Sequence, residues 1–117
     1  MNHSSGNCLR LHRRRSGLSQ QEVAEALGTK DRGAISRYER GHHLPPLSIA
    51  LGLELMFVVP VAELFSGLRE GISAAIEERL AMLEEELGTR SAKGPHARVT
   101  AKKLLWLMER RSARSVA

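Results

Sequence analysis

Apolar residues recur at helical spacing within short segments of this chain, and glycine and proline separate those segments. Val23, Ala24 and Leu27 follow an i, i+1, i+4 pattern, and Ile35 and Tyr38 are three residues apart. No alternation of apolar and polar residues persists as a strand would require, and only four residues are aromatic. The pattern therefore predicts an all-α protein.

Capping residues and helix breakers give the expected helix boundaries. Ser19 is an expected N-cap, Glu22 completes a capping box with it, and Gly28 ends that helix. Asp31 is placed to cap a third helix that runs through Arg40. The expected helices cover residues 9–15, 20–27, 32–40, 47–57, 60–65 and 66–87, and a last helix, capped by Thr100, carries residues 104–108. In the fourth helix we expect Ala50, Leu51 and Leu55 to be buried, and we expect residues 110–117 to be frayed.

The sixth predicted helix carries a continuous apolar stripe formed by Leu68, Ile72, Ile76, Leu80, Leu83 and Leu87. A helix of this length spans about 33 Å at a rise of 1.5 Å per residue, which is too long to lie wholly on a small domain. We interpret the stripe as part of a homodimer interface, to which residues 104–108 of the last helix contribute. The alternative is that the helix folds back on its own domain.

The predicted organisation has three parts. Residues 1–8 are expected to be a disordered N-terminus, and residues 9–65 a domain of five short helices. Residues 66–117 are expected to form a C-terminal helical extension that serves dimerisation. Within the extension, residues 88–99 are small, basic and interrupted by glycine and proline, which indicates a basic linker.

Charge and composition restrict the class of protein. The 117 residues carry a formal net charge of +5, and residues 10–41 alone contain eight basic and four acidic groups. An excess of this sign favours a polyanionic partner. The longest apolar stretch, Leu55–Ala62, is eight residues long, far below the roughly 18 that span a membrane. No secretory signal is recognised, and the single Cys8 excludes an internal disulfide, so we expect a soluble, cytoplasmic protein without membrane association.

Two runs carry a family resemblance. Residues 17–28 read Gly-Leu-Ser-Gln-Gln-Glu-Val-Ala-Glu-Ala-Leu-Gly, and residues 35–41 read Ile-Ser-Arg-Tyr-Glu-Arg-Gly. Together they resemble the Cro/C1-type (XRE) helix-turn-helix family, and Leu-Pro-Pro-Leu at 44–47 and Val-Pro-Val-Ala-Glu-Leu-Phe at 59–65 resemble its fourth and fifth helices. The resemblance covers residues 9–65 and implies a five-helix, lambda-repressor-like DNA-binding domain. Six residues separate Gly28 from Ile35, one more than the usual family pattern.

The resemblance implies a role for several positions. Gln20 begins the second helix, where the family's glutamine touches a phosphate and neighbouring bases. Arginine pairs naturally with guanine, so Arg32 and Arg37 are the expected base readers. Arg40 either contacts a phosphate or caps the third helix, and Arg13 and Glu39 are expected to form a salt bridge between helices one and three. The full set of expected DNA-binding residues is Gln20, Gln21, Lys30, Arg32, Gly33, Ala34, Ser36, Arg37, Arg40, His42 and His43.

Metal and catalytic sites lack support in the sequence. Cys8, His12, His42 and His43 are not linked by the spacing of a zinc site, so we expect no metal. No glycine-rich phosphate loop of the nucleotide-binding types occurs, and we expect neither a cofactor nor enzyme activity.

These observations favour a sequence-specific transcriptional regulator that binds double-stranded DNA, acting as a dimeric repressor. Two alternatives stay open. In one, the protein is an antitoxin whose residues 66–117 bind a partner toxin. In the other, it is a helical interaction module that does not bind DNA.

Overall fold

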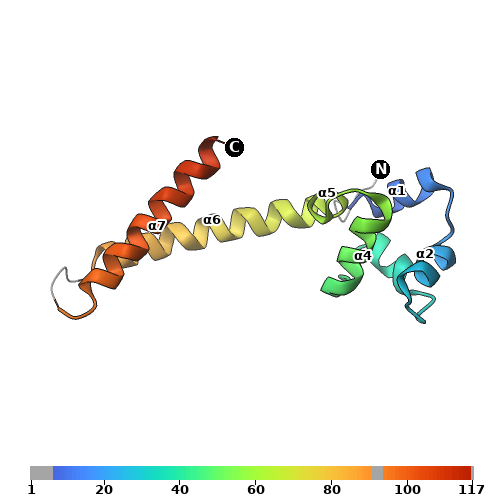
Figure 1. Ribbon diagram of the computed structural model, residues 1–117, viewed down its shortest axis with the longest axis horizontal. Helices are drawn as coiled ribbons and strands as arrows, with labels where there is room; N and C mark the ends of the chain where they lie inside the picture. Colours follow the sequence, from blue (N-terminus) through green and yellow to red (C-terminus); the bar gives the residue numbers. More distant parts are fainter. Residues whose placement is uncertain (1–6, 91–93, 117) are drawn as a thin grey trace. The chain divides into compact units, whose positions relative to one another are not determined.

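In the computed structural model, which describes residues 7–90 and 94–116, every regular element is a helix (Figure 1), as the hydrophobic pattern predicts. The chain divides into two compact units between Ile72 and Ser73. None of the described helices is long and apolar enough to cross a membrane. The helices are α1 (Leu9–Ser16), α2 (Gln20–Leu27), α3 (Ala34–Glu39), α4 (Leu47–Phe57), α5 (Val61–Leu64), α6 (Ser66–Gly88) and α7 (Ala97–Val116).

Helices α1 to α5 enclose one hydrophobic core in the first unit. Tyr38 and Leu27 are partly buried against this core, in agreement with the predicted inward faces of α2 and α3. Each of the five helices contributes at least one buried side chain, and Phe65, directly after α5, contributes another. The buried residues of the core are Leu9, Val23, Ala24, Ile35, Leu53, Leu64 and Phe65.

Helix α2 begins and ends where its capping residues predict. The hydroxyl of Ser19 accepts a hydrogen bond from the Glu22 backbone N–H at 3.0 Å, and the Glu22 carboxylate accepts one from the Ser19 N–H at 2.8 Å. Gly28 then ends the helix with φ at 77°, a left-handed conformation that costs glycine no steric strain. The predicted capping box is therefore confirmed.

The prediction for the inner face of α4 is partly wrong. Ala50 is buried as expected, but Leu51 and Leu55 are 46% and 78% exposed, and Leu53 is fully buried instead. The helix is apolar on all sides, so hydrophobic periodicity cannot select the face that packs inward. Tertiary packing selects it: a Cβ added at Gly52 would lie 2.5 Å from the Leu27 side chain, so the glycine allows α4 to approach α2 closely.

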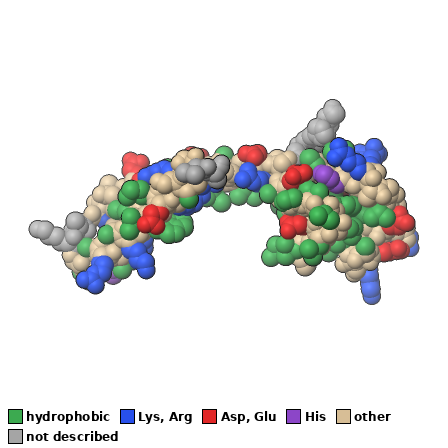
Figure 2. Space-filling model, turned by 45° about the horizontal axis from the view of Figure 1, so that its top comes forward, with side chains coloured by type: hydrophobic (Ala, Val, Ile, Leu, Met, Phe, Trp, Pro, Cys, Tyr) green, Lys and Arg blue, Asp and Glu red, His purple; other side chains and the backbone are tan. Residues whose placement is uncertain are grey.

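The outer face of α4 therefore exposes apolar side chains to solvent. Leu47 and Val58 are exposed together with Leu51 and Leu55, and hydrophobic side chains are visible across the surface of this unit in Figure 2. Val58 also ends α4 with φ at 54°, a conformation that β-branched residues rarely adopt.

Helix α3 begins later than the sequence predicts. We expected Asp31 to cap a helix starting at Arg32, but α3 starts at Ala34 with Gly33 as its N-cap. Asp31 instead uses its side chain inside the turn, where its carboxylate accepts the Gly33 N–H at 3.0 Å. Arg32 and Gly33 consequently lie in the connection between α2 and α3.

A buried ion pair joins α1 to α3, as the family resemblance implies. Arg13 Nε donates to Glu39 Oε2 at 2.5 Å, and Arg13 Nη2 donates to Glu39 Oε1 at 3.2 Å. The hydrogen bond to Glu39, opposed by burial, raises the pKa of the Arg13 guanidinium above its ordinary value. Arg13 Nη1 also donates to the Leu18 carbonyl at 3.0 Å, which holds the connection between α1 and α2.

The expected disordered N-terminus falls mostly on residues 1–6, which lie outside the described residues. The expectation is wrong for Asn7 and Cys8, because both form hydrogen bonds with other residues of the first unit. The Asn7 amide donates to the Tyr38 carbonyl at 2.7 Å, and the Cys8 N–H donates to the Leu64 carbonyl at 2.7 Å.

The second unit contains the C-terminal part of α6 and all of α7. Helix α7 begins at Ala97, three residues before the predicted Thr100 cap, because Gly94, Pro95 and His96 complete the preceding turn. The predicted basic linker, residues 88–99, is therefore partly helical at both ends, and its residues 91–93 lie outside the described residues.

The predicted fraying of residues 110–117 is wrong for residues 110–116, which belong to α7, and Ala117 lies outside the described residues. Arg110 Nη2 lies 2.6 Å from Glu77 Oε2, Arg114 Nε lies 3.1 Å from the same atom, and Arg111 pairs with Glu84. The hydrogen bond from Arg110 lowers the pKa of the Glu77 carboxyl below its ordinary value, although desolvation opposes this shift. These ion pairs between α6 and α7 extend the last helix to Val116.

The free energy of unfolding should depend strongly on the ion pair of Glu39. Its side chain is only 2% exposed and that of Arg13 is 12% exposed, so Glu39→Ala leaves a buried guanidinium unpaired. We expect a loss of about 3 kcal/mol in urea unfolding followed by circular dichroism. Glu63→Ala is the control because the Glu63 side chain is 62% exposed. A loss equal to that of the control would contradict the structural role of the pair.

Stability should also depend on pH through Glu77. A carboxyl whose pKa is lowered on folding adds stability above its unfolded value, near 4.5, and loses it as the pH falls through the folded value. We therefore expect wild type to be more stable than Glu77→Gln near neutral pH, and this difference to disappear in strong acid. Urea unfolding of both proteins across that range measures it, and a constant difference would contradict the assignment.

Candidate nucleic-acid interface

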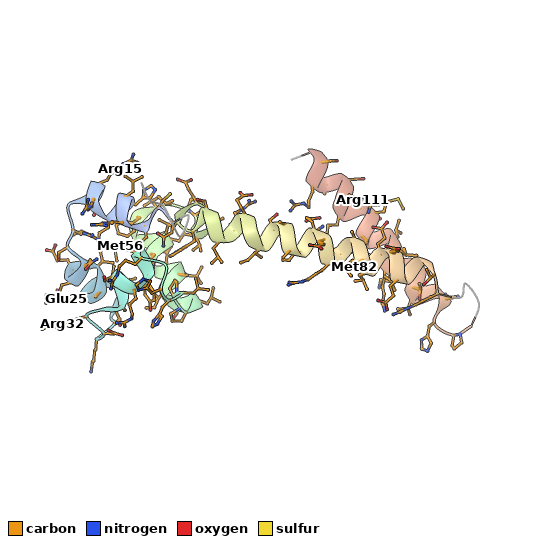
Figure 3. All side chains as sticks on the ribbon, turned by 180° about the vertical axis from the view of Figure 1, so that it is seen from behind. Arg15, Glu25, Arg32, Met56, Met82 and Arg111 are labelled. Carbon is orange, nitrogen blue, oxygen red and sulfur yellow. The ribbon has the colours of Figure 1, made fainter. Side chains whose placement is uncertain are left out.

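Helix α2, the turn after it and α3 place a group of polar and basic side chains at the surface of the first unit. Arg32 extends from the turn away from the body of the domain (Figure 3). Ser36 is half-buried on α3. The exposed members of the predicted set are Gln21, Lys30, Arg32, Arg40, His42 and His43.

Gln20 has a partner inside the protein. Its amide nitrogen donates to Glu39 Oε1 at 3.0 Å, so Glu39 accepts hydrogen bonds from both α1 and α2. The residue is half-buried at the first position of α2. In the free protein Gln20 therefore links α2 to α3, and its amide nitrogen is already engaged.

Ala34 does not reach the surface. It is 4% exposed and begins α3 on the side that faces the core, so its methyl group is not available to a base edge. The prediction followed from an expected helix start at Arg32. Because α3 begins two residues later, Ala34 takes the first position of the helix and is buried there.

Arg37 folds back onto the turn. Its Nη2 donates to Asp31 Oδ2, and its Nε is buried and has no hydrogen-bond partner among the described residues. Gly33 lies directly beneath the guanidinium, since a Cβ added there would be 2.6 Å from Nη1. The Arg37 side chain keeps 32% of its surface exposed, so it is only partly enclosed by these contacts.

The end of α3 carries the remaining predicted contacts. Arg40 Nε donates to the Ser36 carbonyl at 3.4 Å, which is the helix-end contact that we weighed against a phosphate contact. The backbone N–H groups of His42 and His43 both point to the Arg37 carbonyl, at 2.9 and 3.4 Å. Their imidazole rings are exposed next to the last turn of α3.

The position of Asp31 in this site could not be predicted from the sequence, where Asp31 reads only as a capping residue. Its pairing with Arg37 spans six positions, outside the i, i+3 and i, i+4 pairs of a helix. The sequence feature that indicates this pairing is the length of the turn, which is one residue longer than the usual family pattern and places Asp31 ahead of the helix.

The described residues include no group of three or more His, Cys, Asp or Glu side chains that is arranged to hold a metal ion. His12 has Glu63 as its nearest acidic neighbour, with Nε2 and Oε2 3.9 Å apart. Exposed Lys30, Arg32 and Arg40 supply positive charge in the turn and directly after α3, next to the polar side chains of this surface. Such groups suit the phosphates and base edges of a nucleic acid.

Comparison with known proteins agrees with this arrangement. A family model described as a helix-turn-helix domain matches residues 6–53, a span that includes α1, α2 and α3 and most of α4. Comparisons with curated proteins and with solved structures found no match. Domains of this family are DNA-binding modules and are typically not enzymes. Residues 6–53 therefore form a helix-turn-helix domain, consistent with the Cro/C1-type resemblance, and this domain indicates that the protein is a DNA-binding regulator.

Proposed function

We propose that this protein is a sequence-specific, Cro/C1-type regulator that binds double-stranded DNA as a homodimer and represses transcription. The observation that carries the proposal is the helix-turn-helix match at residues 6–53, combined with exposed basic side chains in the turn and directly after α3. In this architecture the second helix of the motif enters the major groove, and the first crosses the backbone.

Arg32 and Arg37 are the proposed base readers. Arg32 extends freely from the turn, and the Arg37 guanidinium lies at the start of the exposed face of α3. A guanidinium offers two parallel N–H donors that match the O6 and N7 acceptors of guanine. Ser36, one turn into α3, is the proposed neighbouring polar contact.

The remaining exposed groups are proposed to contact phosphates and thereby orient the domain on the duplex. Gln21 and Lys30 lie at opposite ends of the segment formed by α2 and the turn. Arg40, His42 and His43 lie after the last turn of α3. Such contacts give affinity and register without reading sequence, and they make binding depend on salt.

Dimerisation is proposed to occur through the second unit. This unit has 45 residues, from Ser73 to Ala117, and Leu87 and Leu107 are its buried leucines. Two helices of this size do not make a core that is stable alone, whereas two such hairpins pack into a four-helix bundle. The side chains available for burial are Ile76, Met82, Leu83, Val99, Leu105, Trp106 and Met108, which are 39% to 64% exposed.

The spacing of these side chains supports an extended interface. Ile76 and Leu83 are seven residues apart on α6, as are Val99 and Trp106 on α7, so each pair lies on one face of its helix. A dimer would present two helix-turn-helix domains to two half-sites, and repression would follow from occupancy of the DNA. The antitoxin alternative uses the same exposed side chains to bind a different protein, and the oligomeric state separates the two.

Replacing Arg32 should weaken recognition. Because one bidentate contact with guanine is worth about 1–3 kcal/mol, we expect Arg32→Ala to lower affinity for the preferred duplex by about 5- to 150-fold. The duplex is first selected from a randomised pool with wild-type protein, and affinity is measured by fluorescence anisotropy at about 0.15 M salt. The selected sequence should contain two half-sites about one helical turn apart.

Arg79→Ala is the matched control because it removes an exposed arginine from α6 and leaves the first unit intact. Equal losses in the two variants would indicate that only net charge matters. A wild-type protein that selects no sequence would contradict the proposed function.

Replacing Leu83 should dissociate the dimer. A glutamate at this position adds charge to the proposed interface, so we expect Leu83→Glu to sediment as a monomer while wild type sediments as a dimer. Leu55→Glu is the control, since Leu55 is an exposed leucine on α4, outside the second unit. Monomeric wild-type protein, or dissociation by Leu55→Glu alone, would contradict this interface.

A further inference from the structure

The turn between α2 and α3 contains an aspartate whose two carboxylate oxygens have different partners. Asp31 Oδ1 accepts the Gly33 N–H at 3.0 Å, and Asp31 Oδ2 accepts from Arg37 Nη2. The Asp31 backbone is tied into the same turn, because its N–H donates to Thr29 Oγ1 at 3.2 Å and its carbonyl accepts the Ala34 N–H at 3.2 Å. One side chain thus connects the shape of the turn to the position of an arginine.

The Arg37 side chain is restrained on several sides. Nη2 is paired with Asp31, and Nε is buried. Nη1 occupies the space that a side chain at Gly33 would fill, since a Cβ there would come within 2.6 Å of it. Yet the Arg37 side chain as a whole is still 32% exposed, so these contacts do not enclose it completely.

We propose that Asp31 is a positioning residue that sets the orientation in which Arg37 reads a base, and that Gly33 provides the space this orientation requires. This inference rests on the proposed function. A flexible arginine pairs with phosphates as readily as with bases, whereas guanine selects a guanidinium whose donors already have the correct direction. By taking one donor of Arg37, Asp31 restricts the directions in which the others point.

The change in DNA affinity on removal of the Asp31 carboxylate distinguishes positioning of Arg37 from simple charge repulsion. A carboxylate close to DNA repels phosphates, so removing it raises affinity for every sequence if repulsion is its only effect. If Asp31 positions Arg37, its removal instead lowers discrimination at one base pair while affinity for unrelated DNA rises. The ratio of specific to non-specific affinity therefore falls if Asp31 positions Arg37, and it stays unchanged if Asp31 only repels phosphates.

Full-length Asp31→Asn, Gly33→Ala and Arg37→Ala test the proposal together. Gly33 has φ at −89°, a conformation that alanine adopts readily, so Gly33→Ala displaces the guanidinium without straining the backbone or changing the charge. Glu63→Gln is the control, because it makes the same charge change as Asp31→Asn at an exposed position on α5.

Each protein is used to select sequences from a randomised duplex pool, and its affinity is measured for the selected duplex and for a scrambled one. We expect Arg37→Ala to abolish a wild-type preference at one base pair. We expect Asp31→Asn and Gly33→Ala to weaken that preference, at the same base pair, by about tenfold. Asp31→Asn should also bind scrambled DNA more tightly, and Glu63→Gln should leave the preference unchanged.

The outcomes that overturn the proposal are distinct. If Arg37→Ala abolishes a preference that Asp31→Asn and Gly33→Ala both keep, positioning by Asp31 is wrong and the proposed function stands. A wild-type preference that Arg37→Ala does not alter excludes both the base contact of Arg37 and its positioning by Asp31, and it leaves sequence-specific DNA binding standing. A wild-type protein with no preference at any base pair overturns both proposals.

Discussion

Glu39 is the group on which the arrangement of the first three helices depends. It belongs to α3, its side chain is 2% exposed, and its carboxylate accepts hydrogen bonds from Arg13 on α1 and from Gln20 on α2. A buried carboxylate is costly unless such donors surround it, so α1, α2 and α3 must meet in one relative position for all of them to form. This constraint determines where the turn after α2 and the exposed face of α3 lie. The proposed DNA contacts are thus held by a polar cluster beneath them and not by the apolar core alone.

A second, smaller polar cluster shapes the surface itself. Contacts among Asp31, Gly33 and Arg37 connect the turn to the exposed face of α3. The additional residue between Gly28 and Ile35 gives this turn its length, and Asp31 closes it. The turn that is one residue longer than the usual family pattern therefore contains the carboxylate that restrains Arg37. Specificity in this protein would then arise partly from a residue that touches no base.

The two units use charge differently. In the first unit a buried ion pair joins α1 to α3, and Gln20 on α2 donates to the same carboxylate, so loss of Glu39 is costly. In the second unit Glu77 and Glu84 pair with arginines of α7 at the surface, where solvent screens them and the net contribution is small. Those pairs orient the hairpin, but they do not bury its exposed leucines and Trp106. The proposed dimer interface supplies the burial that the hairpin lacks.

Local chemistry was sufficient to predict much of this protein. The Ser19–Glu22 capping box and the stop at Gly28 are interactions between near neighbours, and the all-α class follows from helical periodicity. The family resemblance, in turn, implied the pairing of Arg13 with Glu39. Tertiary structure decided what sequence spacing does not encode. Apolar residues occur all around α4 and give it no intrinsic inner face, so packing against α2 decided that Leu53 is buried and Leu55 is exposed. The side-chain hydrogen bonds of Gln20 to Glu39, of Arg37 to Asp31 and of Arg110 to Glu77 likewise form only when folding brings the partners together. The partners are 19, 6 and 33 residues apart in the sequence.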